Sequence, residues 1–161
     1  METAKELIEQ AKTSGKKLVL PIDSVCTGSF PKGPMKKEET KTFDLKPGAG
    51  IPHDMMGLDC GPKTIGAFED GLSGCTKIVM NGPTGVFEIV PFDEGTRGLV
   101  DILEKRTKEG CVTVVGGGDS VAALEAFGKT GAVSYVSTGG GATLELLAGD
   151  ILPGVAAISE V

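Results

Sequence analysis

The feature that most constrains the fold is an alternation of apolar strands and amphipathic helices, in which several strands run directly into a glycine-rich turn. The three turns are Asn81–Glu88, Gly116–Ser120 and Thr138–Ala142. Strands that alternate with helices build right-handed βαβ units around a parallel sheet, and ligands bind beyond the carboxyl ends of its strands. Because all three turns fall at those ends, the sequence predicts an α/β protein that binds a phosphorylated nucleotide.

The pattern predicts elements along most of the chain. Strands are expected at Lys17–Ile22, Lys77–Met80, Cys111–Val115 and Ala132–Val136, with shorter ones at Thr40–Leu45 and Val155–Ile158. Helices are expected at Thr3–Thr13, Lys63–Leu72, Phe92–Lys108, Ser120–Phe127 and Thr143–Ala148, and Gly28–Gly50 is expected to be irregular. We therefore expect one domain over residues 1–161, a three-layer αβα fold with a parallel, Rossmann-like sheet.

Composition and charge exclude several classes of protein. The chain has 161 residues, 40% hydrophobic and 24% charged, as in soluble globular domains. Its net charge is −6 and its basic residues are scattered, so no nucleic-acid partner is expected. No apolar run approaches the length of a membrane span, and the first residues do not resemble a secretory signal. We expect a cytoplasmic protein with no membrane partner.

The cysteines and the single histidine do not predict a metal site. Cys26, Cys60, Cys75 and Cys111 are far apart and form no Cys-x-x-Cys pair, and His53 is the only histidine. Zinc sites built from these residue types need ligands at close, regular spacing. Reduced, partly buried cysteines are therefore expected.

The turn at Gly116–Ser120 has the residues of an anion site. Three glycines without Cβ atoms let the backbone turn tightly and approach a ligand, and the free N–H groups of the following helix start favour an anion. Asp119 can cap that helix or hold Mg²⁺ carried by phosphates. The alternative is a capped turn that touches no ligand. The same device recurs one βα unit later at Thr138–Ala142, which favours anion binding.

The turn at Asn81–Glu88 is the most distinctive of the three. Its Asn-Gly-Pro start fixes a rigid exit from the strand, and the carboxylate of Glu88 can accept hydrogen bonds from ribose hydroxyls. Neither a Walker motif nor the dinucleotide fingerprint G-x-G-x-x-G is present, which disfavours a nicotinamide-dependent oxidoreductase. With one histidine, a Ser/His/Asp triad is not credible either.

These motifs resemble the carboxyl-terminal part of phosphoglycerate kinase. They read Asn-Gly-Pro-Thr-Gly-Val-Phe-Glu from residue 81, Val-Gly-Gly-Gly-Asp-Ser from residue 115 and Ser-Thr-Gly-Gly-Gly-Ala-Thr-Leu-Glu-Leu-Leu from residue 137. The segments Met56–Pro62 and Leu152–Val155 resemble the same family. Their order and spacing agree over essentially the whole chain.

The resemblance implies a glycolytic enzyme that transfers phosphate between 1,3-bisphosphoglycerate and ADP, giving 3-phosphoglycerate and ATP. It implies that Glu88 holds the ribose, that Asp119 takes the Mg²⁺ of Mg-ATP or Mg-ADP, and that Gly57 and Leu58 border the adenine. Backbone N–H groups of Gly118 and Gly140 would meet the transferring phosphoryl group. The full set of implied nucleotide-binding residues is Gly57, Leu58, Asn81, Gly82, Thr84, Phe87, Glu88, Gly117, Asp119 and Ser120.

The same resemblance implies that part of the enzyme lies outside this chain. Members of the family hold 3-phosphoglycerate on a basic amino-terminal domain and carry nucleotide-binding lysines upstream, whereas the three turns here contain no Lys or Arg. Cationic clamps contribute strongly to phosphoryl transfer. We therefore expect a fragment that is inactive alone and prone to self-association. The alternative is a non-catalytic nucleotide-binding or interaction module derived from this fold.

Overall fold

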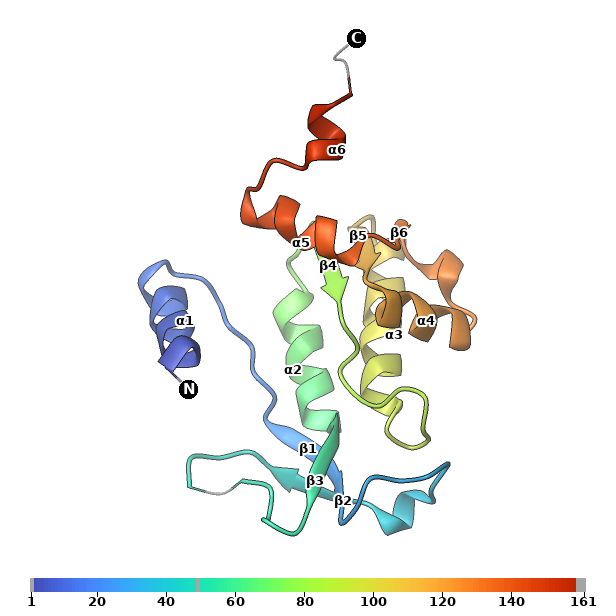
Figure 1. Cartoon of the computed structure of the whole chain (residues 1–161). Coiled ribbons are helices and arrows are strands. Elements are labelled where there is room, and N and C mark those ends of the chain that lie inside the picture. Colours follow the sequence, from blue (N-terminus) through green and yellow to red (C-terminus); the bar gives the residue numbers. More distant parts are fainter. Residues whose placement is uncertain (1, 49, 159–161) are drawn as a thin grey trace.

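The computed structural model describes residues 2–48 and 50–158 and contains the predicted parallel sheet (Figure 1). Strands β4 (Lys77–Asn81), β5 (Val112–Gly116) and β6 (Tyr135–Ser137) lie side by side in that order, all parallel. Register pairs Val79 with Val114 and Met80 with Val115. The prediction of an α/β fold around a parallel sheet is confirmed.

The core lies on one face of this sheet, under the connecting helices. Helices α3 (Glu94–Lys108) and α4 (Gly118–Ala126) join successive strands, and α2 (Pro62–Leu72) precedes them. The buried cluster contains Ile78, Met80, Val100, Leu103, Cys111, Val115, Leu124 and Val133. Side chains that point to the other face are exposed: Val79 by 42%, Val112 by 39% and Tyr135 by 66%. Burial on one face therefore fixes the register of the strands.

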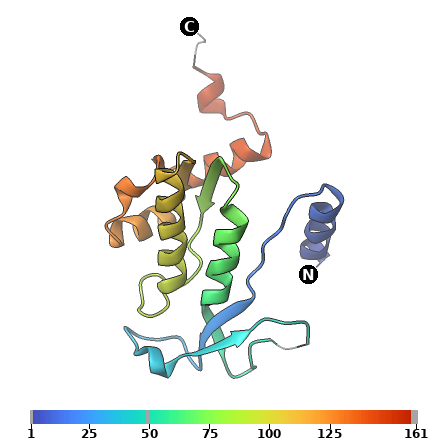
Figure 2. The same cartoon turned by 180° about the vertical axis from the view of Figure 1, so that it is seen from behind.

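A second, antiparallel sheet lies at the other end of α2 (Figures 1 and 2). Its strand order is β2–β1–β3, from Lys41–Asp44, Asp23–Thr27 and Met56–Cys60. The sequence predicted a single parallel sheet, and the structure contains this antiparallel sheet in addition to it. Of the three strands in the antiparallel sheet, only β2 was predicted, as the short strand at Thr40–Leu45. The segment around Gly28–Gly50 (residue 49 lies outside the described residues) also holds a 3-10 turn, η1, at Lys37–Glu39.

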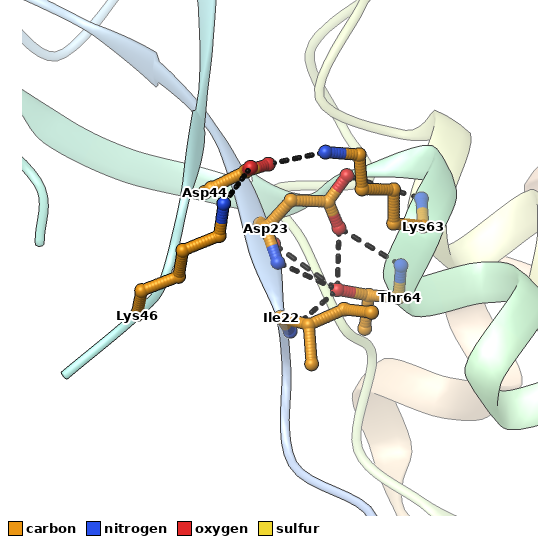
Figure 3. A network of polar contacts seen from close by, with 6 residues as sticks. All are labelled: Ile22, Asp23, Asp44, Lys46, Lys63 and Thr64. Carbon is orange, nitrogen blue, oxygen red and sulfur yellow. Dashed lines mark hydrogen bonds and ion pairs between the residues drawn. The ribbon is translucent and has the colours of Figure 1, made fainter. Parts of the chain in front are cut away.

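Asp23 fastens α2 to the antiparallel sheet (Figure 3). Its buried carboxylate accepts hydrogen bonds from the backbone N–H of Lys63 (3.0 Å), the N–H of Thr64 (2.8 Å) and the Thr64 hydroxyl (2.6 Å). The first N–H groups of a helix have no partner within the helix, so a carboxylate from a neighbouring strand satisfies them and complements the helix dipole. Asp44 pairs nearby with Lys63 and Lys46, which lowers its pKa.

The predicted strand at Lys17–Ile22 is wrong. These residues form an extended connection from α1 (Glu2–Thr13) to β1, and no backbone hydrogen bond joins residues 17–21 to a strand in the described part of the chain. A strand needs a paired neighbour. The connection and the free edge of β4 do not pair, and both border a cavity of about 530 Å³ lined by Lys17, Val19 and Val79 among others.

The carboxyl-terminal prediction also needs correction. The strand expected at Val155–Ile158 is wrong, because α6 (Pro153–Ala156) starts there with a proline at its first helical position. A short apolar run does not distinguish strand from helix by its period. β6 is shorter than expected because a 3-10 turn, η2 (Thr130–Ala132), precedes it.

Helix α1 stands apart from the rest of the molecule in both views (Figures 1 and 2). It is the helix predicted at Thr3–Thr13, and it has no buried residue; Leu7 on its apolar side is 58% exposed.

In the described residues, no helix is long and apolar enough to cross a membrane.

Candidate functional site

The three glycine turns contact one another at the carboxyl edge of the parallel sheet. The N–H of Gly82 donates to the hydroxyl of Ser120 at 2.7 Å, which joins the first turn to the second. The amide nitrogen of Asn81 lies 3.4 Å from the carbonyl oxygen of Gly140, which joins the first turn to the third. A Cβ on Gly140 would lie 2.6 Å from the Cα of Gly117, so the second and third turns touch through their backbones.

Two of these contacts depend on glycine for conformational reasons. Gly82 has φ +101° and Gly117 has φ +91°, a region that residues with a Cβ seldom adopt. Gly117 is also the residue before α4, so its backbone bend aims the first N–H groups of that helix at the edge of the sheet. The predicted role of glycine in turning the chain tightly is therefore confirmed at both positions.

Residues at the start of α4 divide into one that faces solvent and one that is buried. Asp119 is exposed, and its predicted role as a ligand of Mg²⁺ stays a prediction. Ser120 has no exposed surface, and its hydroxyl is held against the first turn. Its predicted contact with phosphate stays a prediction. Among the described residues, no group of three or more His, Cys, Asp or Glu side chains forms a metal site.

The loop after β4 leaves the parallel sheet and reaches the antiparallel sheet. The N–H of Val86 donates to the carbonyl of Leu58 on β3 at 2.9 Å, and the N–H of Thr84 donates to the hydroxyl of Thr96 on α3 at 3.2 Å. Phe87 is half-buried and Glu88 is exposed. The predicted adenine-side residues around Leu58 are thus brought beside the loop.

Five of the predicted site residues line two separate hollows. The cavity of about 530 Å³ beside β4 is lined by Asn81, Gly82 and Thr84, with Lys17 as a cation in its wall. A smaller hollow of about 240 Å³ is lined by Gly57, Leu58 and Thr84. The predicted residues outside both linings are Phe87, Glu88, Gly117, Gly118, Asp119, Ser120 and Gly140. Thr84 lines both hollows.

Sequence reasoning missed Asp59 as a residue of this region. It is 4% exposed and its carboxylate accepts hydrogen bonds from the N–H groups of Gly95 (2.7 Å) and Cys60 (2.8 Å). Burial raises the pKa of Asp59 to about 7, although these two hydrogen bonds act to lower it. Burial also raises the pKa of the Cys60 thiol to about 11. The only sequence signal was the place of Asp59 within the Met56–Pro62 motif.

Comparison with known proteins decides the family. A family model described as Phosphoglycerate kinase matches residues 1–150. The chain belongs to the phosphoglycerate kinase family. Curated members include a phosphoglycerate kinase of Thermosipho africanus, 48% identical over 99% of this chain, and one of Leuconostoc citreum, 46% identical over 99%. The chain spans 38% and 37% of those two proteins.

Solved phosphoglycerate kinase structures share the fold. The enzyme of Coxiella burnetii is 35% identical with a TM-score of 0.80, and the match covers 96% of this chain and 38% of that one. The enzyme of Pyrococcus horikoshii is 29% identical with a TM-score of 0.63, over 96% and 37%. As in the sequence analysis, this chain corresponds to part of a phosphoglycerate kinase.

Most ion pairs lie away from the three turns of this phosphoglycerate kinase chain. Lys105 of α3 pairs with Glu69 of α2, and Lys108 and Lys129 both pair with Glu104. These pairs lie on the outer surfaces of helices. The three turns contain no Lys or Arg, and the carboxylate of Asp119 is exposed at the start of α4.

Proposed function

We propose that this chain is the nucleotide-binding part of a cytoplasmic phosphoglycerate kinase, which transfers a phosphoryl group between 1,3-bisphosphoglycerate and ADP to give 3-phosphoglycerate and ATP. The observation that carries the proposal is the mutual contact of the three glycine turns, in which Gly140 lies against Gly117 and Ser120 holds Gly82. Such a cluster presents several backbone N–H groups to one bound phosphate chain. The membership of the chain in this family supports the proposal.

Six of the predicted residues have an assigned role in this proposal. Gly57 and Leu58 would border the adenine, and Glu88 would hold the ribose. The N–H groups of Gly118 and Gly140 would meet the transferring phosphoryl group. Asp119 would bind Mg²⁺ together with the phosphates, and the ion when bound neutralises phosphate charge. The exposed position of Asp119 fits that role.

The chain alone is proposed to bind nucleotide without catalysing phosphoryl transfer. The three turns contain no Lys or Arg, and phosphoryl transfer depends on cations that neutralise developing charge. 1,3-Bisphosphoglycerate and 3-phosphoglycerate would bind to a further domain outside this chain. The alternative is a module that binds nucleotide or a protein partner and has no catalytic role.

A pair of glycine variants tests nucleotide binding. Gly140→Ala would push a Cβ to 2.6 Å from the Cα of Gly117, whereas Gly141→Ala meets no atom within 4 Å. We expect calorimetry with Mg-ADP to show binding by the unchanged chain and by Gly141→Ala, and affinity weakened about tenfold or more by Gly140→Ala. If the unchanged chain does not bind Mg-ADP at millimolar concentration, the proposal is wrong.

A coupled assay separates the kinase from the non-catalytic alternative. The chain should bind Mg-ADP yet give no ATP from 1,3-bisphosphoglycerate. Adding a separately expressed segment that holds all of a phosphoglycerate kinase upstream of the part matched by this chain should restore turnover if this chain is its catalytic complement. Binding without any restored turnover would favour the non-catalytic module, and robust turnover by the chain alone would overturn the proposed inactivity.

A further inference from the structure

The carboxylate of Asp59 lies where three separate segments meet. Asp59 is on β3, and its Oδ2 accepts the N–H of Gly95 at 2.7 Å, in the first turn of α3. Its own carbonyl oxygen accepts the hydroxyl of Ser24 on β1 at 2.9 Å. A carboxylate that is 4% exposed is costly unless its oxygens accept hydrogen bonds. This side chain therefore occupies a place that the surrounding backbone is built to accept.

Two glycines make the space that the carboxylate fills. A Cβ on either Gly85 or Gly95 would overlap Oδ1 of Asp59. Gly85 belongs to the loop after β4, and Gly95 belongs to α3. The carboxylate consequently packs directly against the backbone of both segments, with no side chain between them.

Two backbone N–H groups of the loop after β4 also donate hydrogen bonds to neighbouring elements. The N–H of Val86 donates to the carbonyl of Leu58, next to Asp59 on β3, at 2.9 Å. The N–H of Thr84 donates to the fully buried hydroxyl of Thr96 at 3.2 Å. Residues 84–86 are thus fixed to β3 on one side and to α3 on the other. Asp59 lies at the centre of this joint.

We propose that Asp59 is a positioning residue for the nucleotide site: it fixes the Gly82–Glu88 loop between β3 and α3, so that the loop meets the nucleotide in one orientation. This inference rests on the proposed function for its effect on affinity. Its effect on the loop itself does not depend on nucleotide. Asp59 touches the loop backbone and α3, and it acts on the ligand through them.

Asp59→Asn is the direct test. The amide group replaces one acceptor oxygen by a donor, which then faces the N–H of Gly95 or the N–H of Cys60. At about pH 8, where a carboxyl with a pKa of about 7 is mostly ionised, we expect the amides of Val86 and Gly95 to exchange hydrogen at least about tenfold faster, and Mg-ADP affinity to fall about tenfold. The amide of Val121, which donates to Gly117 within α4, should exchange as before. Asp54→Asn, at an exposed position, is the matched control.

Gly85→Ala tests the same joint from the loop side and leaves Asp59 unchanged. Its Cβ would displace the carboxylate, whereas Gly74→Ala meets no atom within 4 Å. We expect Gly85→Ala to reproduce the exchange pattern of Asp59→Asn and Gly74→Ala to resemble the unchanged chain. In the unchanged chain, Val86 and Gly95 should share one opening free energy as urea is added, a measurement that needs no variant.

The outcomes separate this inference from the proposed function. If the unchanged chain does not bind Mg-ADP but Val86 and Gly95 open together and both variants release them, the proposed function fails and the joint stands. If Mg-ADP binds, but Val86 and Gly95 open independently or Asp59→Asn keeps full affinity and protection, the positioning role is wrong.

Discussion

The hydroxyl oxygen of Ser120 lies 2.7 Å from the backbone nitrogen of Gly82, and Ser120 has no exposed surface. Ser120 is the third residue of α4, and Gly82 is the first residue after β4. This part-buried hydrogen bond makes the second glycine turn a support for the first. Any loss of it leaves an N–H of the candidate site without its partner.

Ser120→Ala should therefore weaken both the fold and the site. We expect a loss of about 1–2 kcal/mol in the free energy of unfolding, because the half-buried N–H of Gly82 is left unpaired. Urea unfolding measures it, and calorimetry should show weaker Mg-ADP binding. Ser73→Ala removes an exposed hydroxyl that donates to the carbonyl of Asp70 and should cost clearly less. Equal losses in the two variants would contradict the role given to Ser120.

Asp23→Asn should detach α2 from the antiparallel sheet in part. The carboxylate accepts three hydrogen bonds from Lys63 and Thr64, and an amide replaces one acceptor by a donor (Figure 3). We expect a loss of about 1–3 kcal/mol in the free energy of unfolding. Asp44→Asn, which breaks exposed pairs with Lys63 and Lys46, should have a smaller effect that disappears at high salt.

Helix glycines should respond to alanine in opposite directions. Gly66 on α2 has open space around it, so Gly66→Ala should stabilise the chain by about 0.5–1 kcal/mol. On α3, a Cβ at Gly98 would lie 2.8 Å from a methyl carbon of Ile65, so Gly98→Ala should destabilise it. Thermal unfolding measures both. In an Ile65→Ala background the penalty of Gly98→Ala should vanish; a penalty that persists would mean that the helices are not this close.

Stability should fall as pH rises from about 4 to about 7, through Asp59. Burial raises the pKa of this carboxyl from 3.8 to about 7, so the folded chain holds a proton that the unfolded chain has lost in this window. Linkage then lowers the free energy of unfolding with rising pH, by at most about 4 kcal/mol at roughly 1.4 kcal/mol per pKa unit. Urea titrations at several pH values measure this slope. Asp59→Asn should flatten it, and an unchanged slope in that variant would assign the proton elsewhere.

Glu104 should act in the opposite direction at lower pH. Hydrogen bonds from Lys108 and Lys129 lower the pKa of Glu104 from 4.5 to about 2. Its stabilising pairs are therefore present above pH 4.5 and are lost as pH falls toward 2. Between pH 5 and pH 3, Glu104→Gln should lose less stability than the unchanged chain does, whereas Glu125→Gln, at an exposed position of α4, should behave like the unchanged chain.

Self-association should depend on the exposed face of the parallel sheet. β4 is paired on one edge only in the described part of the chain, and Val79, Val112 and Tyr135 present apolar surface beside it. Sedimentation should show association that increases with concentration. Val79→Lys should reduce it without changing the unfolding midpoint much, since Val79 is 42% exposed. A chain that stays monomeric at high concentration would contradict this prediction.

The glycine turns show how far the sequence determines this protein. Strand, glycines and helix start follow one another at Val115–Ser120, and this local order alone predicts a parallel βαβ unit with its turn at the carboxyl edge. The motifs were also enough to predict the family. Turn chemistry and periodicity are local properties, which is why β4, β5, α3 and α4 appear close to their predicted places.

Only the tertiary structure decided the features that depend on contacts between residues far apart in the sequence. Lys17–Ile22 has the composition of a buried strand, yet it forms no strand because no described segment pairs with it. The packing of Asp59 depends on Gly85 and Gly95, which lie 26 and 36 residues further along the chain and meet its carboxylate only in the folded protein. Pairing and close packing are relations between residues far apart in sequence, so a local pattern holds no information about them.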